Sequence, residues 1–413
     1  MQNKSLLIRN INKLIGIIDE PSPLKKGRAL SLINTIENAF LLIDKGKIHS
    51  FGKMKDCPEN ADKIINADGA IVLPAWIDSH THIVFPATRE LEFIDKIKGL
   101  SYEEIAKRGG GILNTAKKMT LADEDYLFDS AMKRIDEIIR LGTGGVEIKS
   151  GYGLSFDNEI KMLRVIKRIK EAAPIPVKAN FLGAHALPPE YKDSREDYIK
   201  LIIDKMLPYI ADNELADYID VFCDKGFFTV EETDTILQAG AKYNLKPKIH
   251  ANELDTSGGI QVGVKNNAVS VDHLEFTGDK EIESLKNSAT VPTLLPSTAF
   301  FLRLKYAPAR KMIDSGLGVA LASDYNPGSS PSGNMQFVIS LASIYMKMLP
   351  EEAINAATIN GAYALELQNT LGSISTGKIA NIIITKPLDN IALIPYFFGS
   401  NIVDKMIISG KEY

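Results

Sequence analysis

Two of the six histidines in the sequence stand one residue apart, in the run Asp78-Ser79-His80-Thr81-His82. An apolar segment typical of a β-strand leads into this run. Because side chains alternate faces along a strand, His80 and His82 could direct both imidazoles at one ion. On its own, the pair is also consistent with two histidines that merely lie near a strand end. The interpretation therefore depends on which other ligands reach the same place.

Three more residues of metal-ligand type follow apolar runs later in the chain, namely His250, His273 and Asp324. If these runs are parallel strands of one barrel, their carboxyl ends meet at a single face, where active sites of such barrels lie. Three imidazoles and one carboxylate suit a single Zn²⁺, or another first-row metal such as iron, with one position open for water. His273 could instead be a fifth ligand or orient a neighbouring group.

A metal ion with an open position lowers the pKa of bound water and polarises a carbonyl, which is hydrolytic chemistry at neutral pH. The reaction also needs a group that moves the proton. Glu253 follows His250 by three residues and His273 ends the next predicted strand, so both could reach the reacting water. We expect a catalytic set of Glu253, His273 and Asp324, in which Glu253 transfers the proton and His273 orients or shares it.

Loops after the predicted strands carry side chains suited to a small anionic substrate. Arg89 lies seven residues beyond His82, and arginine can bind a carboxylate through two parallel hydrogen bonds. Tyr152 stands between two glycines, and His185 follows a Gly-Ala pair. The turn Asn326-Pro327-Gly328-Ser329-Ser330 offers amide, hydroxyl and backbone donors. Taken singly, each glycine-rich turn is equally consistent with a plain strand-to-helix loop.

These residues need a scaffold that brings several strand ends together. Eight short apolar or β-branched runs recur along the chain, at 76–83, 145–150, 177–183, 218–223, 247–251, 268–274, 290–295 and 318–323. Amphipathic or charged helical segments lie between them, at 121–141, 157–173, 191–210, 230–243 and 279–287. Strand followed by helix eight times predicts an α/β protein with a (β/α)8 TIM barrel.

The two ends of the chain have a different pattern. Short alternating runs typical of strands occur at 6–8, 40–43, 47–51 and 70–73, and again at 381–385 and 402–409 after a helix-rich segment at 334–367. Neither end has enough apolar material for a core of its own. We therefore expect residues 1–73 and 371–413 to form one composite β-sandwich domain and residues 74–370 to form the metal-dependent hydrolase barrel.

Charge and cysteine content narrow the function classes. The chain has 48 Lys and Arg residues against 52 Asp and Glu residues, a net charge of −4, so no basic excess favours nucleic acid or anionic lipid. With only Cys57 and Cys223, neither a disulfide framework nor a cysteine zinc site can form. Residues 1–18 contain no signal-peptide core or membrane span. We expect a cytoplasmic enzyme that binds neither nucleic acid nor membranes.

Two glycine-rich segments imitate nucleotide-binding motifs. Residues 372–378 end in Gly-Lys but continue with Ile379 where a phosphate-binding loop needs Ser or Thr, so we expect a turn before a C-terminal strand. Residues 109–111 are three glycines without dinucleotide-binding spacing, and they suit a loop near the barrel mouth.

Longer blocks around these residues resemble the amidohydrolase superfamily and, within it, the imidazolonepropionase family of histidine degradation. The blocks are DSHTHIVF at 78–85, RELEF at 89–93, SYEEIA at 101–106, GGGI at 109–112, EIKSGYGL at 147–154, FLGAH at 181–185, HANE at 250–253, DHLE at 272–275 and SDYNPG at 323–328. The His-x-His pair alone would indicate only the superfamily. The blocks around Arg89, Tyr152 and His185 indicate the narrower family.

The resemblance implies a role for each matched position. It implies one Zn²⁺ or Fe³⁺ per subunit, held by His80, His82, His250 and Asp324. It implies substrate contacts from Arg89, Tyr152, His185, Glu253 and Ser329, and product contacts from Tyr152, Asn326 and Gly328. The implied reaction is hydrolysis of 4-imidazolone-5-propanoate to N-formimidoyl-L-glutamate, with Arg89 on the propanoate tail. A homodimer is common in related barrels.

The chain departs from the family pattern at two places away from the expected site. Trp76-Ile77 precedes the first motif where a smaller, proline-rich lead is usual, and Ala380-Asn381 replaces the usual Ala-Asp.

Three alternatives remain open at this point. A mononuclear deaminase of a cyclic amidine or nucleobase would share the ligand set, although a neutral nucleobase has no use for Arg89. A dinuclear hydrolase would need a carboxylated lysine, for which Lys225 after the fourth predicted strand is the candidate. A non-catalytic scaffold barrel has no reason to keep four polar ligands converging.

Overall fold

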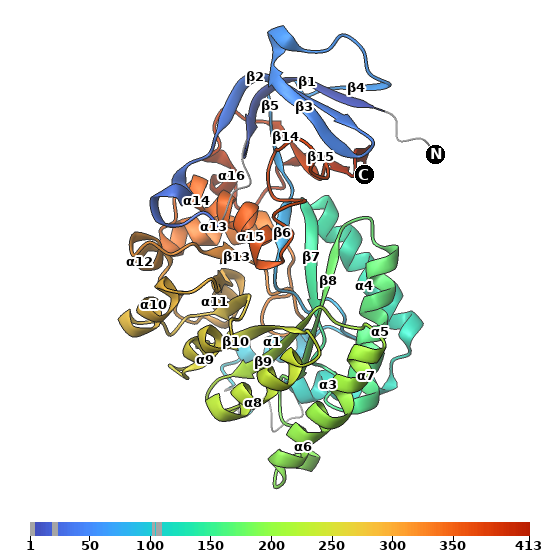
Figure 1. The fold of residues 1–413 in the computed structure, drawn as a ribbon, viewed down its shortest axis with the longest axis vertical. Coiled ribbons are helices and arrows are strands. Elements are labelled where there is room, and N and C mark those ends of the chain that lie inside the picture. The colour runs from blue at the N-terminus through green and yellow to red at the C-terminus, as the bar shows by residue number, and fades with distance from the viewer. Residues whose placement is uncertain (1–4, 19–23, 101–103, 105–109) are drawn as a thin grey trace.

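The computed structural model describes residues 5–18, 24–100, 104 and 110–413 (Figure 1). The SYEEIA block, apart from Glu104, and Gly109 of the GGGI block lie outside these described residues. Figure 1 shows a barrel with a separate sheet at one end, where blue strands from the start of the chain lie beside red strands from its end. The predicted α/β barrel and the β domain composed of both chain ends are therefore confirmed.

In the described part of the chain, the barrel is an eight-stranded parallel sheet with the order β13-β12-β11-β10-β9-β8-β7-β6. Its strands are β6 (Trp76–Asp78), β7 (Thr143–Lys149), β8 (Val177–Ala184), β9 (Tyr218–Cys223), β10 (Lys246–Ala251), β11 (Ser270–His273), β12 (Val291–Leu294) and β13 (Ala320–Leu321). All of these strands are buried along most or all of their length, as expected for a sheet covered by helices on its outer face.

The first predicted strand is longer than the observed one. β6 ends at Asp78, because the Asp78 carboxylate accepts hydrogen bonds from the backbone N–H of Ser323 at 2.9 Å and from its hydroxyl at 2.5 Å. His80 and His82 follow in an extended segment. The Asp324 N–H donates to the His80 carbonyl at 3.0 Å, and the His82 N–H donates to the Tyr325 carbonyl at 2.9 Å. These bonds join the first and last strand segments of the barrel at the candidate ligands themselves.

Helices follow the strands and cover the outside of the barrel. They are α1 (Glu90–Ile97), α3 (Ile112–Leu121), α4 (Glu124–Arg140), α5 (Phe156–Ala172), α6 (Arg195–Leu201), α7 (Leu207–Asp212), α8 (Val230–Ala241), α9 (Gly259–Lys265), α10 (Asp279–Lys286), α11 (Pro296–Leu302), α12 (Ala309–Asp314), α13 (Met335–Met346), α14 (Pro350–Ala357) and α15 (Ile359–Ala364). A π-helical turn, Ile202–Met206, joins α6 to α7. Side chains of Asp123, Ser155 and Thr229 cap α4, α5 and α8, which explains where these helices begin.

The second sheet has the order β16-β15-β14-β5-β1-β2-β3, with β4 paired to β1. Its strands are β1 (Leu6–Ile15), β2 (Thr35–Asp44), β3 (Lys47–Lys53), β4 (Lys63–Asn66), β5 (Ala70–Pro74), β14 (Ile382–Pro387), β15 (Val403–Ile408) and β16 (Lys411–Glu412). The short helix α16 (Leu393–Tyr396) lies between β14 and β15. β5 pairs antiparallel with β14, so strands from opposite ends of the chain complete one sheet.

Part of the N-terminal region packs on the barrel instead of the sheet. The 3-10 helix Gly27–Ser31 is held there because the Gly27 N–H donates to the Leu317 carbonyl at 3.0 Å. The Asn355 side chain donates to the Leu30 carbonyl at 2.7 Å. Within the described residues, no helix combines the length and the apolarity needed to cross a membrane.

Candidate active site

His80, His82 and His250 meet at one point in the barrel. One ring nitrogen from each lies within 4.8 Å of the other two, and all three residues are buried. His250 Nε2 lies 3.5 Å from His82 Nε2. Asp324 Oδ1 lies 3.5 Å from both His80 Nε2 and His82 Nε2. The structure thus brings together all four positions that the sequence resemblance indicates as metal ligands.

The donor set fits a metal ion. Tetrahedral zinc with bonds of about 2.0–2.1 Å separates neighbouring ligand atoms by about 3.4 Å, close to the spacing seen here. His80 Nε2 is buried and, among the described residues, has no hydrogen-bond partner. A buried imidazole nitrogen without a partner is costly unless something else satisfies it. The three histidines and this unpaired nitrogen together indicate a metal site at this place.

The protonation of these groups also suits metal binding. Burial, and then the neighbouring positive charges, lower the pKa of His80 and His82 well below the usual range, so both imidazoles are neutral at pH 7. Burial raises the pKa of Asp324 to about 6, although the Thr298 hydroxyl donates to its carboxylate at 2.5 Å and opposes that rise. Neutral imidazole and carboxylate are the forms that bind metals.

Two carboxylates behind the histidines fix their orientation. Asp272 Oδ2 lies 2.7 Å from His80 Nδ1, and Asp220 Oδ1 lies 3.0 Å from His250 Nδ1. Each carboxylate therefore accepts a hydrogen bond from the Nδ1–H group and leaves Nε2 for the metal side. Sequence reasoning quoted Asp272 only as part of a motif and missed Asp220. Asp220 is the only charged residue of β9, whose other residues are apolar or aromatic. This exception could have indicated a functional role.

A buried ionic network supports these carboxylates. Lys149 Nζ lies 2.7 Å from Asp220 Oδ2 and 3.7 Å from Asp272 Oδ2, and it also donates to Glu147. Burial alone would lower the pKa of Lys149, but the adjacent carboxylates of Asp220 and Glu147 raise it, so the side chain stays charged. Lys248 donates to Glu147 and, at 2.9 Å, to the Ser79 carbonyl. The barrel interior beneath the site is thus charged and hydrogen-bonded.

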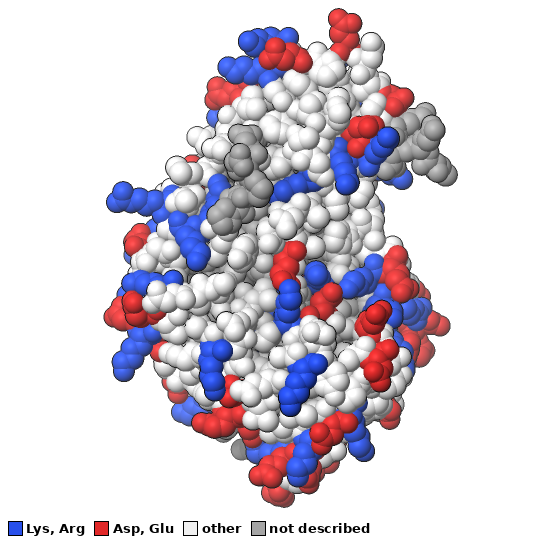
Figure 2. Space-filling view, in the orientation of Figure 1, with Lys and Arg blue, Asp and Glu red and all other residues white. Residues whose placement is uncertain are grey.

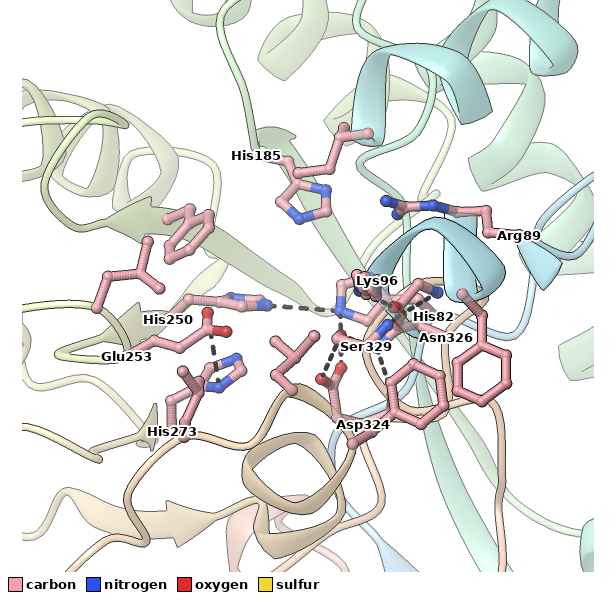
Figure 3. Close-up of a pocket in the computed structure, with 18 of the residues that line it drawn as sticks. His82, Arg89, Lys96, His185, His250, Glu253, His273, Asp324, Asn326 and Ser329 are labelled. Carbon is pink, nitrogen blue, oxygen red and sulfur yellow. Dashed lines mark hydrogen bonds and ion pairs between the residues drawn. The ribbon is translucent and has the colours of Figure 1, made fainter. Parts of the chain in front are cut away.

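Glu253 and His273 lie together on one side of the site (Figure 3). His273 Nδ1 is 3.8 Å from Glu253 Oε2 and 3.9 Å from Glu275 Oε2. Burial raises the pKa of Glu253 to about 8, with further contributions from the charges of Asp324 and Asp224. Burial also lowers the pKa of His273 well below its usual range. A carboxyl group with a pKa near neutrality can both accept and donate a proton.

Three residues of the site have strained backbones. Asn252, His273 and Asp324 have φ angles of 55°, 83° and 53°, in the left-handed region that favours glycine. Such strain costs about 1–3 kcal/mol per residue and is found where function requires a particular side-chain direction.

A cavity of about 580 Å³ opens onto the candidate metal centre. Every expected substrate or product residue lines it, namely Arg89, Tyr152, His185, Glu253, Asn326, Gly328 and Ser329. Figure 3 shows His250, Glu253 and His273 on one side and Arg89 on the other. Phe93, Phe222, Phe227 and Phe301 add apolar surface to the walls.

His185 and Tyr152 form the wall next to His82. The His185 ring stacks on the His82 ring with a centroid distance of 5.4 Å, and its Nδ1 lies 2.9 Å from the Gly151 carbonyl. Burial, with the nearby His250, lowers the pKa of His185 to about 3, so the ring is neutral. Burial raises the pKa of Tyr152, so its phenol stays protonated. Gly151 has φ 106° and a Cβ there would lie 2.9 Å from His185 Nδ1, which explains the glycine.

The turn after Asp324 is held by its own side chains. Asn326 Nδ2 donates to the Asp324 carbonyl and to Ser329 Oγ, both at 2.7 Å. Asn326 Oδ1 accepts from the N–H groups of Gly328 and Ser329, both at 2.8 Å. Asn326 therefore shapes the turn that presents Gly328 and Ser329 to the cavity.

Arg89 reaches the cavity from the start of α1. Its Nε and Nη2 lie 2.8 Å and 2.6 Å from Glu92 Oε2, so one edge of the guanidinium is paired. Glu92 also accepts from the Gly111 N–H at 3.1 Å and from Asn114 at 3.2 Å. Lys96, two helical turns beyond Arg89, lines the same cavity. Sequence reasoning quoted Glu92 only as part of a motif and missed Lys96, although both lie on the helical face that carries Arg89.

Three residues that are not part of the expected site lie away from the cavity, namely Lys225, His49 and Lys378. The Lys225 side chain is 80% exposed and lies 3.6 Å from Asp255, so it is not placed to bridge two metal ions. His49 is an exposed residue of β3, as expected. The Lys378 ammonium donates to the Gln368 carbonyl and the Ser373 hydroxyl, both at 2.6 Å, within the turn that leads into β14.

Comparisons with known proteins agree with the geometry. Residues 71–413 match the model of the amidohydrolase family. An imidazolonepropionase from Flavobacterium johnsoniae is 56% identical over 406 residues, which cover 98% of this chain and 99% of that protein. Imidazolonepropionases from Christiangramia forsetii and Geobacillus thermodenitrificans are 52% and 40% identical, over 98% and 99% of this chain and 99% and 97% of theirs.

Solved structures of two deaminases share the fold at low sequence identity. An adenosine deaminase from Xanthomonas campestris with bound zinc is 16% identical, with a TM-score of 0.72 over 98% of this chain and 92% of that chain. The guanine deaminase of E. coli is 15% identical, with a TM-score of 0.72 over 98% and 99%. Family model and relatives together give one conclusion: the chain belongs to the amidohydrolase family and, within it, to the imidazolonepropionases.

Proposed function

We propose that this protein hydrolyses the cyclic amide bond of 4-imidazolone-5-propanoate to give N-formimidoyl-L-glutamate, a step of histidine degradation. One observation carries the proposal from the structure. A single cavity holds a metal-type donor set on one side and the Arg89 guanidinium on the other. Such a cavity suits a small substrate with a hydrolysable ring at one end and a carboxylate at the other.

The metal would be one Zn²⁺ or one iron ion per subunit, held by His80, His82, His250 and Asp324. When bound, such an ion lowers the pKa of water and polarises a carbonyl group. The zinc in the related adenosine deaminase supports a first-row metal. Ligand type alone does not choose between zinc and iron, because the same donors suit both.

The chain's own residues would orient the substrate. Arg89 would hold the propanoate carboxylate through the guanidinium edge that faces away from Glu92. Tyr152 and His185 are neutral and buried beside His82, so they suit hydrogen bonds to the polar atoms of the imidazolone ring. Ser329 would contact the same substrate from the turn at 326–330. The apolar walls exclude water from the remainder of the ring.

Glu253 is the proposed proton carrier. Its carboxyl group has a pKa raised to about 8 by burial and lines the cavity beside His273. It would accept a proton from the attacking water and deliver one to the departing ring nitrogen, while His273 orients it. Asp324 would complete the catalytic set. After ring opening, Tyr152, Asn326 and Gly328 would contact the product.

The cellular setting and assembly are also proposals. Low cysteine content and the near-neutral charge balance support a cytoplasmic protein that binds no nucleic acid or membrane. Exposed aromatic and aliphatic side chains on α13 and α16, including Tyr396 at 72% and Phe398 just after α16 at 60%, support a homodimer. We assign residues 1–73 and 371–413 to the β domain and residues 74–370 to the barrel.

Replacing Arg89 tests the substrate assignment. R89A should raise KM for imidazolone propanoate far more than for a tail-less imidazolone. Only the first substrate has a carboxylate that contacts Arg89, so only this substrate loses an interaction. Steady-state ring-opening assays on both substrates give the comparison. Equal increases for both substrates would contradict the assignment. Ammonia release from adenosine or guanine, without ring opening of imidazolone propanoate, would favour the deaminase alternative instead.

A further inference from the structure

The Arg89–Glu92 pair is close to electrically neutral. Two nitrogens of the guanidinium lie within 2.8 Å of one Glu92 oxygen. Burial opposes ionisation of Glu92, but the hydrogen bonds and charge of Arg89 lower its pKa, so the carboxylate is ionised. One positive and one negative charge then cancel at the place where the substrate tail is expected. Arg89 supplies hydrogen-bond geometry there, but the pair supplies little net attraction for an anion.

Lys96 lies beside this pair. Its ammonium donates to the Gly328 carbonyl at 3.1 Å, and its side chain lines the cavity. Arg89 contacts the same glycine, since a Cβ on Gly328 would lie 2.1 Å from Arg89 Nη1. Both cations therefore contact one residue of the Asn326–Ser329 turn. In Figure 3, Arg89 lies to the right of His250 and Glu253, and Lys96, Asn326 and Ser329 lie between them, where they overlap His82 in the view.

The charge of Lys96 is available to a ligand. Among the described residues, its ammonium forms a hydrogen bond with a neutral carbonyl and no ion pair. Burial, and then the adjacent Arg89, lower its pKa, and the charge of Glu92 opposes this shift. The Lys96 side chain is half-buried against the Phe301 ring, whereas Arg303, another cation of the cavity lining, is exposed. An anion bound here would be attracted with less screening by solvent.

We propose that Lys96 is a specificity-determining residue that supplies the unpaired positive charge for the substrate's carboxylate tail, while Arg89 supplies its bidentate hydrogen bonds. This role of Lys96 rests on the proposed function, to which it adds a second cation for the substrate tail. Lys96 also ties α1 to the turn through Gly328. Binding of the tail therefore engages α1 and the turn together.

Charge removal at Lys96 separates this role from a structural one. K96M keeps the length of the side chain and should raise KM for imidazolone propanoate by roughly 10- to 100-fold, the range for a hydrogen bond to a charged group. The kcat should change by less than about threefold, because the tail is remote from the reacting bond. KM for the propanamide analogue, whose tail is neutral, should stay the same. K96R keeps the charge and should bring KM most of the way back to the wild-type value.

Lys98 provides the matched control, since it is an exposed lysine at the end of the same helix. K98M should leave both substrates unaffected. An equal effect of K96M on the acid and the amide, or no effect on either, would overturn the role of Lys96 while the wild-type enzyme still opened the ring. Failure of the wild-type, metal-loaded protein to open the ring would overturn the proposed function itself.

Discussion

At the residue scale, the site depends on buried polar groups in which a lysine contacts carboxylates and the carboxylates contact histidines. Asp272 and Asp220 orient His80 and His250, and Lys149 contacts both carboxylates. His80 and His250 thus each present Nε2 to the proposed metal position. These two rings need no rearrangement to bind an ion there, because their Nδ1 atoms are already held.

Glu253 gives a direct test of proton transfer. E253Q keeps the shape of the side chain but removes its ability to accept a proton, so kcat should fall by roughly 10²- to 10⁴-fold. The metal content should stay the same, because Glu253 lies outside the proposed ligand set. Steady-state kinetics and metal analysis on one sample measure both quantities. The control is E283Q, a change at an exposed residue of α10. A kcat within threefold of the wild-type value would remove Glu253 from the mechanism.

Lys149 should matter for stability as well as for ligand orientation. K149M leaves Asp220 and Asp272 buried without their cation, and breaking a buried pair costs about 3–5 kcal/mol. K170M removes a partly exposed lysine that lies 2.9 Å from Asp217, and such a pair contributes less than about 1 kcal/mol. Urea unfolding of the metal-free proteins compares the two variants. Similar losses of unfolding free energy in both would show that the buried network has no special role.

Single residues of the site could be predicted from sequence where their type is unusual. The histidines and Asp324 are metal-ligand types that follow predicted strands, and the resemblance supplied the expected roles of these residues and of Arg89. The supporting residues Glu147, Asp220 and Lys248 were harder to predict, because the sequence does not show which charged groups pair inside the barrel. Their partners come from different strands, and only the closed barrel brings them into contact.

At the element scale, the lengths of strands and turns decide where the side chains point. β6 ends at Asp78, and hydrogen bonds to the segment at 323–325 replace the strand pairing that the sequence predicts. The β-branched residues Thr81 and Ile83 extend the strand-like composition past the end of the strand, so composition alone could not locate this end. The proposed ligands His80 and His82 therefore lie just beyond the strand instead of within the sheet.

The turn after β13 can be tested at Gly328. A Cβ at this position would lie 2.1 Å from Arg89 Nη1, so G328A must displace the guanidinium. We expect KM for imidazolone propanoate to rise by roughly tenfold or more, since a displaced Arg89 loses a charged hydrogen bond. G399A is the control, because a Cβ there meets no atom within 4 Å. Unchanged kinetics in G328A would contradict the placement of Arg89 against the turn.

At the scale of the whole molecule, Asn381 is one of the residues that join the sheet to the barrel. Asn381 Nδ2 donates to the Gly144 carbonyl at 2.7 Å, and its Oδ1 accepts from the Ser409 N–H at 2.9 Å. An aspartate, which the resemblance leads one to expect at this position, could not donate to the Gly144 carbonyl. The asparagine therefore supplies a donor at the junction.

N381D should weaken this junction. The new carboxylate would face the Gly144 carbonyl without a donor, and a buried acceptor left in this way costs about 1–3 kcal/mol. N401D is the control, because the side-chain oxygen of Asn401 only accepts from the Val403 N–H and an aspartate can do the same. Chemical denaturation should show a lower unfolding free energy for N381D alone. Equal stability of N381D and the wild-type protein would contradict the role of the amide as donor.

The overall architecture could be predicted well because it depends on patterns that repeat. Alternation of strand and helix predicts the barrel. Neither end of the chain has enough apolar residues for a core of its own, which predicts that the two ends form one domain. The packing of Gly27–Ser31 on the barrel was not predictable, because short polar segments have no period that reveals their partner. Tertiary contacts such as Asn355 with Leu30 decide its position.

The most direct test of the central claim is a ring-opening assay on protein of known metal content. Metal-depleted protein is titrated with Zn²⁺ or iron, supplied with 4-imidazolone-5-propanoate, and analysed for N-formimidoyl-L-glutamate by mass spectrometry. We predict that turnover is absent without metal, rises in proportion to bound metal and reaches its maximum at one ion per chain. No product at one bound ion per chain, or full turnover by the metal-free protein, would contradict the claim.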